Sequence, residues 1–177
     1  MMSHPRRSVD FQPLSIALLT VSDSRTLADD VSGDTLRDRV EAAGHRVADR
    51  ALVPDDVYQM RAVVSAWIAR SDVEAVLITG GTGFTGRDRT PEAIEPLLDT
   101  LIPGFGEHFR AVSVDEIGSA AYLSRAFAGV ANATLIFGLP GSPGACRTAW
   151  DRILSAQLDV RTAPCNYVSL MPRLDER

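Results

Sequence analysis

The sequence is poor in features that mark several large classes of protein. It contains only two cysteines among 177 residues, Cys146 and Cys165, so neither a disulfide framework nor a cysteine-rich metal centre is expected. No apolar run is long enough to cross a bilayer, and the polar N-terminus lacks the apolar core of a signal peptide. We therefore predict a cytoplasmic protein with no membrane partner.

Positive charge is not in excess either. The 18 basic residues are outnumbered by 23 acidic ones, which leaves a net charge of −5. Because nucleic-acid platforms are usually basic, we expect no nucleic-acid partner. A hydrophobic content of 45% is ordinary for a globular protein. We expect one domain at residues 13–172, a flexible N-terminal tail at residues 1–12 and a C-terminal tail at residues 173–177.

Apolar runs alternate with amphipathic segments along the chain. Strands are predicted at residues 15–21, 45–53, 73–78 and 134–139, with a last short strand at 167–171. Helices are predicted to start near Ser32, after Asp56 and at Thr90. In the last of these, Thr90 is expected to be the N-cap and Pro91 to lie in the first turn. Further helices are predicted at residues 120–128 and 144–158. This alternation predicts an α/β protein with three α/β/α layers and a mostly parallel sheet.

The most informative stretch is residues 76–91, which read VLITGGTGFTGRDRTP. A buried strand breaks into Gly80, Gly81, Thr82 and Gly83, and the chain then passes Asp88 before a helix begins. Backbone N–H groups in such a loop cradle an anion, and a nearby carboxylate suits a divalent cation. The spacing matches neither the P-loop nor the dinucleotide fingerprint. The pattern predicts a phosphate or nucleotide site with a metal-binding carboxylate.

Three other loops follow predicted strands and should lie at the same edge of the sheet. They contain Ser22 and Asp23, then Asp55, and then Gly141 and Ser142. The last pair predicts a second anion-binding loop, for which a plain turn is an equal alternative.

The charged candidates have structural alternatives as well. Asp55 is a metal ligand or a helix N-cap, and Asp56 competes for both roles. Asp88 is a metal ligand or the partner of Arg87 or Arg89 in an ion pair. Arg87 itself is a pyrophosphate contact or a solvated surface side chain.

Several motifs recur in a characteristic order. Residues 80–83 and 88–93 read GGTG and DRTPEA, residues 19–23 read LTVSD, and residues 53–56 read VPDD. Residues 103–107 and 139–143 read PGFGE and LPGSP. This series resembles the molybdopterin-binding MoaB/MogA-like family of molybdenum cofactor biosynthesis. Residues 145–150 and 157–159 are similar to the MoaB branch in particular.

The resemblance implies a MogA-like molybdopterin-binding fold and an enzyme that transfers AMP from Mg-ATP to molybdopterin. It implies that Asp55 and Asp88 are the catalytic pair and hold Mg²⁺. The substrate-binding candidates are Ser22, Asp23, Gly80, Gly81, Thr82, Gly83, Arg87, Gly141 and Ser142. Two alternatives remain open: a non-catalytic molybdopterin carrier or assembly factor, and a nucleotide-binding module outside the family. The presence of both acidic residues favours catalysis.

Assembly is a further expectation. The C-terminal half contains more large apolar side chains than one small sheet obviously covers, namely Phe105, Phe109, Tyr122, Phe127 and Trp150. The resemblance implies a homotrimer or homohexamer, with other cofactor-biosynthesis proteins as additional partners.

Overall fold

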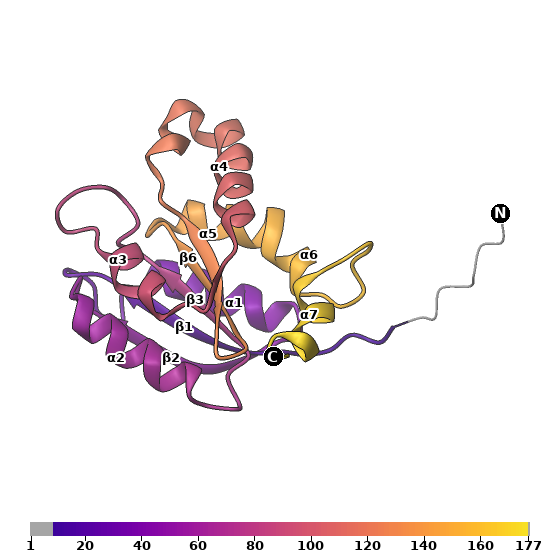
Figure 1. Ribbon diagram of the computed structural model, residues 1–177. Coiled ribbons are helices and arrows are strands. Elements are labelled where there is room, and N and C mark those ends of the chain that lie inside the picture. The colour runs from indigo at the N-terminus through magenta and orange to yellow at the C-terminus, as the bar shows by residue number, and fades with distance from the viewer. Residues whose placement is uncertain (1–8, 177) are drawn as a thin grey trace.

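The computed structural model describes residues 9–176 and has three layers, with helices on both faces of one sheet (Figure 1). The predicted α/β/α class is confirmed. Most of the predicted N-terminal tail, residues 1–8, lies outside the described residues. The six strands are β1 (Ser15–Val21), β2 (Arg46–Val53), β3 (Ala75–Thr79), β4 (Thr100–Leu101), β5 (Phe127–Ala131) and β6 (Thr134–Leu139).

The strands lie in the order β2-β1-β3-β6-β5-β4. Strands β2, β1, β3 and β6 run parallel to one another, whereas β5 runs antiparallel to both β6 and β4. The chain places β2 on one side of β1 and β3 on the other, which makes the β1/β3 boundary a topological switch point. In open α/β sheets ligands bind at such a point, outside the carboxyl ends of the strands.

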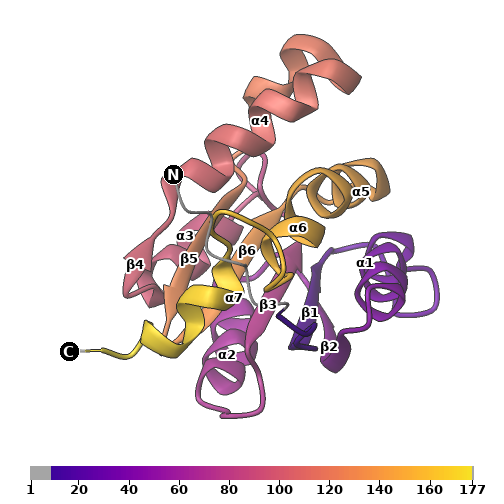
Figure 2. The same cartoon turned by 90° about the vertical axis from the view of Figure 1, so that its right-hand side faces the viewer.

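Helices cover the sheet on both sides (Figure 2). They are α1 (Val31–Ala42), α2 (Val57–Ile68), α3 (Thr90–Ile94), η1 (Glu95–Leu97), α4 (Pro103–Ile117), η2 (Gly118–Leu123), α5 (Pro143–Ala149), the π-helical η3 (Trp150–Leu154), α6 (Ser155–Gln157), α7 (Tyr167–Leu170) and η4 (Met171–Arg173). Helix α4 and segment η2 project beyond the sheet in both views. No helix within residues 9–176 is both long and apolar enough to cross a membrane.

Two buried clusters form the core, one on each face of the sheet. Leu36 of α1 and Trp150 of η3 lie in the first, and Met60 and Trp67 of α2 lie in the second. Burying one such side chain stabilises the fold by about 1.5–3 kcal/mol. Each of these helices thus buries one face against the sheet, α1 through Leu36 and α2 through Met60 and Trp67.

Two predicted segments are wrong. Residues 120–128 were expected to be helical, but η2 ends at Leu123 and Phe127 begins strand β5. Strand β5 forms an antiparallel hairpin with β6 through the two-residue turn Asn132-Ala133, both at positive φ, and this pairing overrides the helix preference of an alanine-rich segment. Residues 167–171 were expected to be a strand, but they start helix α7, because the Asn166 side chain accepts a hydrogen bond from Ser169 N and caps the helix.

A third correction concerns Thr90. It lies inside the first turn of α3, and its hydroxyl donates to Gly80 O at 2.8 Å instead of capping the helix. Pro91 occupies the first turn as predicted. The hydroxyl therefore fastens the helix start to the glycine loop.

Most of the aromatic side chains expected at a subunit interface are covered by the chain itself. Phe105, Phe109, Phe127 and Trp150 are buried, whereas Tyr122 is 72% exposed. The premise behind the predicted oligomer therefore holds for Tyr122 alone of these five residues, and the assembly remains a prediction.

Candidate functional site

The four loops predicted to share one edge of the sheet do meet there. Ser22 N donates to Val53 O at 2.9 Å, which joins the loops after β1 and β2. Gly80 N donates to Leu139 O at 3.0 Å, which joins the ends of β3 and β6. Between them lies a cleft of about 300 Å³. It is lined by Thr20, Val21, Ser22, Ser24, Arg25, Thr79, Gly80, Gly81, Thr82, Gly83, Asp88, Pro140 and Gly141.

Glycine is required in the first turn of this cleft by the protein's own atoms. Gly81 has a φ of +63°, and a Cβ there would lie 2.3 Å from Thr90 Oγ1 and 3.1 Å from an Asp55 carboxylate oxygen. A Cβ on Gly80 would lie 2.1 Å from Val21 O. These glycines therefore let the loop pack against β1 and α3, in addition to presenting the backbone N–H groups expected to cradle an anion.

Asp55 and Asp88 flank the glycine loop. The Asp55 carboxylate lies against Gly81, and Asp88 Oδ2 lies 2.6 Å from the position of a Cβ on Gly83. Residues 33 positions apart in sequence thus present carboxylates to neighbouring residues of one loop. This is the arrangement expected if both carboxylates address one cation held beside phosphate oxygens.

Asp55 is not the cap of α2. Asp56 performs that role, because its side chain accepts hydrogen bonds from Tyr58 N and Gln59 N. The Asp55 carboxylate instead accepts one bond from Arg89 N at 3.3 Å. Burial raises the pKa of Asp55 above its ordinary value, and repulsion from Asp23 and Asp88 adds to the rise. A carboxylate in such surroundings is relieved by a cation.

Asp88 is held in its own loop. Burial alone would raise its pKa, but hydrogen bonds from the Thr85 hydroxyl and the Thr85 and Gly83 backbone outweigh it and lower the pKa. The Thr85 N to Asp88 Oδ2 distance is 2.9 Å. Neither of the ion pairs considered for Asp88 forms: within residues 9–176, Arg87 pairs with Asp23 and Arg89 makes none. Asp88 therefore stays ionised beside the cleft.

Asp23 and Arg87 bridge two of the loops. Their side chains form an ion pair, which holds the pKa of Asp23 below its ordinary value. The other Asp23 carboxylate oxygen accepts a bond from Asp55 N at 3.0 Å. Arg87 is 71% exposed, so it lies at the rim and outside the lining of the cleft.

The cleft obtains its positive charge from a residue that the sequence reading missed. Arg25, on the loop after β1, lines the cleft and donates to Ser32 Oγ at 2.9 Å and to Gly141 O at 3.3 Å. It is the one basic side chain among the described lining residues. Ser22 supports this loop, since its hydroxyl accepts a bond from Arg25 N at 3.2 Å.

The second loop contributes in two ways. Gly141 lines the cleft, while Ser142 caps α5 by accepting a bond from Ala145 N at 3.1 Å. Within residues 9–176, no group of three or more His, Cys, Asp or Glu side chains is placed to hold a metal. A cation at Asp55 and Asp88 would therefore need further oxygens from a bound phosphate group and from water.

Comparison with known proteins decides the family. Residues 17–160 match the family described as "probable molybdopterin binding domain". This chain belongs to that molybdopterin-binding, MoaB/MogA-like family. Molybdenum cofactor biosynthesis protein B from Escherichia coli (strain K12) is 57% identical over 160 residues, which cover 90% of this chain and 94% of the relative.

Solved structures agree. A crystal structure of molybdenum cofactor biosynthesis protein B superposes with a TM-score of 0.81 at 42% identity and covers 83% of this chain and 92% of its own. A structure of MogA superposes with a TM-score of 0.70 at 31% identity, over 81% and 97% of the two chains. The molybdopterin-binding fold read from the motifs is confirmed.

In this molybdopterin-binding protein the glycine loop is held from behind by Arg125, which sequence reasoning also missed. Its Nε donates to Gly83 O at 2.6 Å, and its terminal nitrogen donates to Asp88 O at 2.7 Å. Arg125 N donates to Thr82 O at 2.9 Å, and the side chain pairs with Glu92. One guanidinium therefore spans both ends of the loop that carries Asp88. No motif signals this role, because Arg125 reaches the loop only through the fold.

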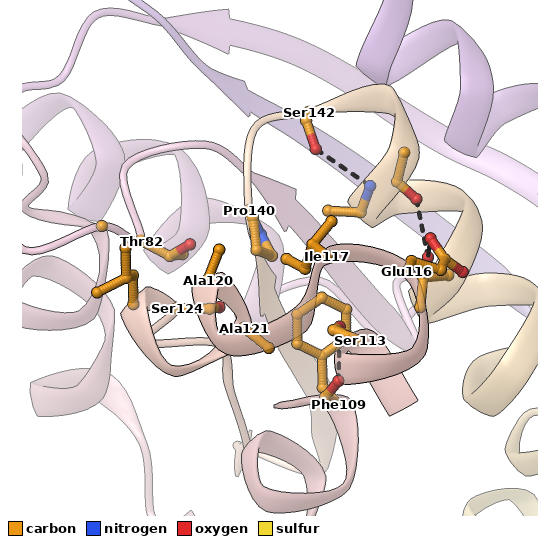
Figure 3. A pocket seen from close by; sticks show the side chains of 15 residues that line it. Thr82, Phe109, Ser113, Glu116, Ile117, Ala120, Ala121, Ser124, Pro140 and Ser142 are labelled. Atoms are coloured by element: carbon orange, nitrogen blue, oxygen red, sulfur yellow. Dashed lines mark hydrogen bonds between the residues drawn. The ribbon is translucent and has the colours of Figure 1, made fainter. Parts of the chain in front are cut away.

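A second cavity, of about 280 Å³, adjoins the cleft (Figure 3). The two share Thr82, Gly83 and Pro140. Its other walls come from the C-terminal half of α4, from η2 and from the start of α5. The combined space has a polar end built from glycine loops and an end with mostly apolar walls, which suits a ligand that carries a phosphate at one end and a ring at the other.

Proposed function

We propose that this protein acts in molybdenum cofactor biosynthesis as a molybdopterin adenylyltransferase. The observation that carries the proposal is the placement of Asp55 and Asp88 on either side of the glycine loop, in a molybdopterin-binding fold. The family description supports molybdopterin as a ligand, and the names of the relatives support the biosynthetic role. ATP is proposed as the second substrate.

In the reaction, an oxygen of the terminal phosphate of molybdopterin attacks the α-phosphorus of ATP. The new P–O bond forms as the bond to the bridging oxygen breaks, and pyrophosphate leaves. The attacking phosphate is already ionised, so no strong general base is needed. Positioning and charge neutralisation supply the rate.

The residues that line the cleft, Asp88 among them, and those beside it, Asp55 among them, divide the tasks in this scheme. The backbone of Gly80 to Gly83 binds phosphate oxygens, and Arg25 adds a guanidinium. Asp55 and Asp88 would hold Mg²⁺, which fits their oxygen donors and the unrelieved repulsion around Asp55. The bound ion would supply charge neutralisation between the phosphates of the two substrates. Ser22, Asp23 and Arg87 order the surrounding loops.

The test is incubation of the purified protein with molybdopterin, ATP and Mg²⁺, followed by separation of the products. Adenylylated molybdopterin and pyrophosphate should appear in equal amounts. Tight molybdopterin binding without either product would contradict catalysis and would make the protein a carrier or assembly factor.

A further inference from the structure

Among the described residues that line the cavity beside the cleft, one carries a carboxylate. Glu116, near the end of α4, lines it together with Phe109, Ile117 and Ala121. In Figure 3, Glu116 and Thr82 lie on opposite sides of the cavity. Thr82 belongs to the glycine loop, so the carboxylate stands at the end away from the proposed phosphate site.

One oxygen of the Glu116 carboxylate has a hydrogen-bond partner, and the other has none among the described residues. Thr148 Oγ1, from the buried side chain of Thr148 on α5, lies 2.8 Å from Glu116 Oε2. Glu116 Oε1 has no hydrogen-bond partner among the residues that the structure describes, and Glu116 forms no ion pair there. Its neighbour Asp115 is different, because it points to the surface and pairs with Arg152. Glu116 is itself exposed, and it lines space with mostly apolar walls while one of its oxygens is held by Thr148.

We propose that Glu116 is a specificity-determining residue that binds the pyrimidine edge of the pterin ring. This inference rests on the proposed function, in which the phosphate of the same molybdopterin molecule lies at the glycine loop. The edge of a 2-amino-4-oxopteridine presents a ring N–H and an exocyclic amine side by side. A carboxylate accepts both in a bidentate, charge-assisted arrangement. In molybdopterin this edge lies at the opposite end from the phosphate, as Glu116 lies opposite Thr82.

The same chemistry excludes adenine from this cavity. Its Watson–Crick edge offers one amine beside a ring nitrogen that is itself an acceptor, and two acceptors repel one another. The cavity therefore discriminates between the two substrates, and the adenine of ATP must bind elsewhere. A carboxylate that accepts two donors binds less tightly an analogue that presents one donor and one acceptor, because one hydrogen bond is lost and the two acceptors repel one another.

The experiment compares two phosphate-free rings, pterin and lumazine, which differ by exchange of the 2-amino group for an oxygen. Binding is measured by fluorescence titration, without ATP or Mg²⁺, at a slightly acidic pH where both rings are neutral. The wild type should bind pterin about tenfold or more tightly than lumazine. Glu116→Gln, which keeps the size and offers a donor to the new oxygen, should remove or invert that preference. Asp115→Asn is the matched control and should behave as the wild type.

Equal affinity of the wild type for the two rings would overturn the proposal, as would an unchanged preference in Glu116→Gln. Circular dichroism of each variant separates these results from misfolding. The role of Glu116 can fail while the proposed reaction stands. If the Glu116→Gln variant adenylylates molybdopterin with an unchanged KM for molybdopterin, only the role of Glu116 is overturned. A wild type that prefers pterin but forms no adenylylated product contradicts the adenylyltransferase and leaves the ring site intact.

Discussion

Arg125→Ala should loosen the loop that carries Asp88 without unfolding the protein. The substitution removes hydrogen bonds to Gly83 O and Asp88 O, at 2.6 and 2.7 Å, and the ion pair with Glu92. A bond from a charged donor contributes about 1.5–3 kcal/mol. The Arg125 side chain is 34% exposed, so solvent screening places the loss at the low end, about 2–3 kcal/mol for the set.

Most of this loss should appear locally, because two of the three contacts hold the glycine loop and the third holds Glu92 of helix α3, which directly follows that loop. A loss of about 2 kcal/mol in the free energy of local opening corresponds to roughly thirtyfold faster amide exchange. The amides to follow are those of Thr85 and Asp88, which donate hydrogen bonds inside the loop. Hydrogen exchange resolved by NMR measures them individually.

The control is Arg173→Ala, which removes an exposed ion pair with Glu176 and should change stability by less than about 0.5 kcal/mol. Arg125→Lys keeps the charge but cannot span both carbonyls, so it should rescue only part of the loss. Wild-type exchange rates at Thr85 and Asp88 in Arg125→Ala would refute the reasoning, because the guanidinium would then not be what orders the loop.

Three other predictions follow from the structure. The raised pKa of Asp55 means that its ionised form destabilises the folded protein. Asp55→Asn removes this charge, and its amide oxygen can still accept the hydrogen bond from Arg89 N, so the variant should have a higher melting temperature at pH 7. That gain should shrink as the pH falls through the unfolded value of about 3.9 and vanish at about pH 3 or below, where the carboxyl is neutral in both states; an equal gain at pH 7 and at about pH 3 would contradict it. Burial lowers the pKa of His45, whose Nδ1 accepts a hydrogen bond from Leu14 N. The contribution of His45 to the free energy of unfolding is therefore complete above the histidine pKa of the unfolded chain, about 6.5, and declines as the pH falls below that value. Denaturant titrations should show this slope in the wild type and a smaller one in His45→Asn; equal slopes would show that His45 is not its source. The predicted homotrimer or homohexamer should appear in light scattering at micromolar concentration, and Tyr122→Asp should weaken it; a monomeric wild type would refute it.

Local patterns predicted the elements that build the cleft. Strands β1, β3 and β6 are buried along their whole length, so they read as continuous apolar runs. Their order of appearance, with helices between them, was enough to place four loops at one edge of the sheet. Asp55 and Asp88 could therefore be brought together before the fold was known.

The contacts that depend on tertiary placement could not be predicted. Strand β5 is a different case: it forms a local hairpin with β6 through Asn132 and Ala133, and the helix preference of the preceding residues masked that signal. The Asp55 cap was ambiguous in sequence, since either of two adjacent aspartates could begin α2, and only the geometry assigns the cap to Asp56. Arg25, Glu116 and Arg125 act on partners more than 30 residues away, across loops whose path no spacing rule gives.

The most direct test of the adenylyltransferase follows the α-phosphate of ATP into molybdopterin. With α-labelled ATP and Mg²⁺, the wild type should transfer the label to molybdopterin. Asp88→Asn should transfer none while it still binds molybdopterin, because an amide keeps the loop bond to Thr85 but not the charge that holds the cation. Its loss of stability should stay near 1 kcal/mol or less. Label transfer by Asp88→Asn at the wild-type rate would contradict the assignment of the acidic pair, and no transfer by the folded wild type would contradict the enzyme itself.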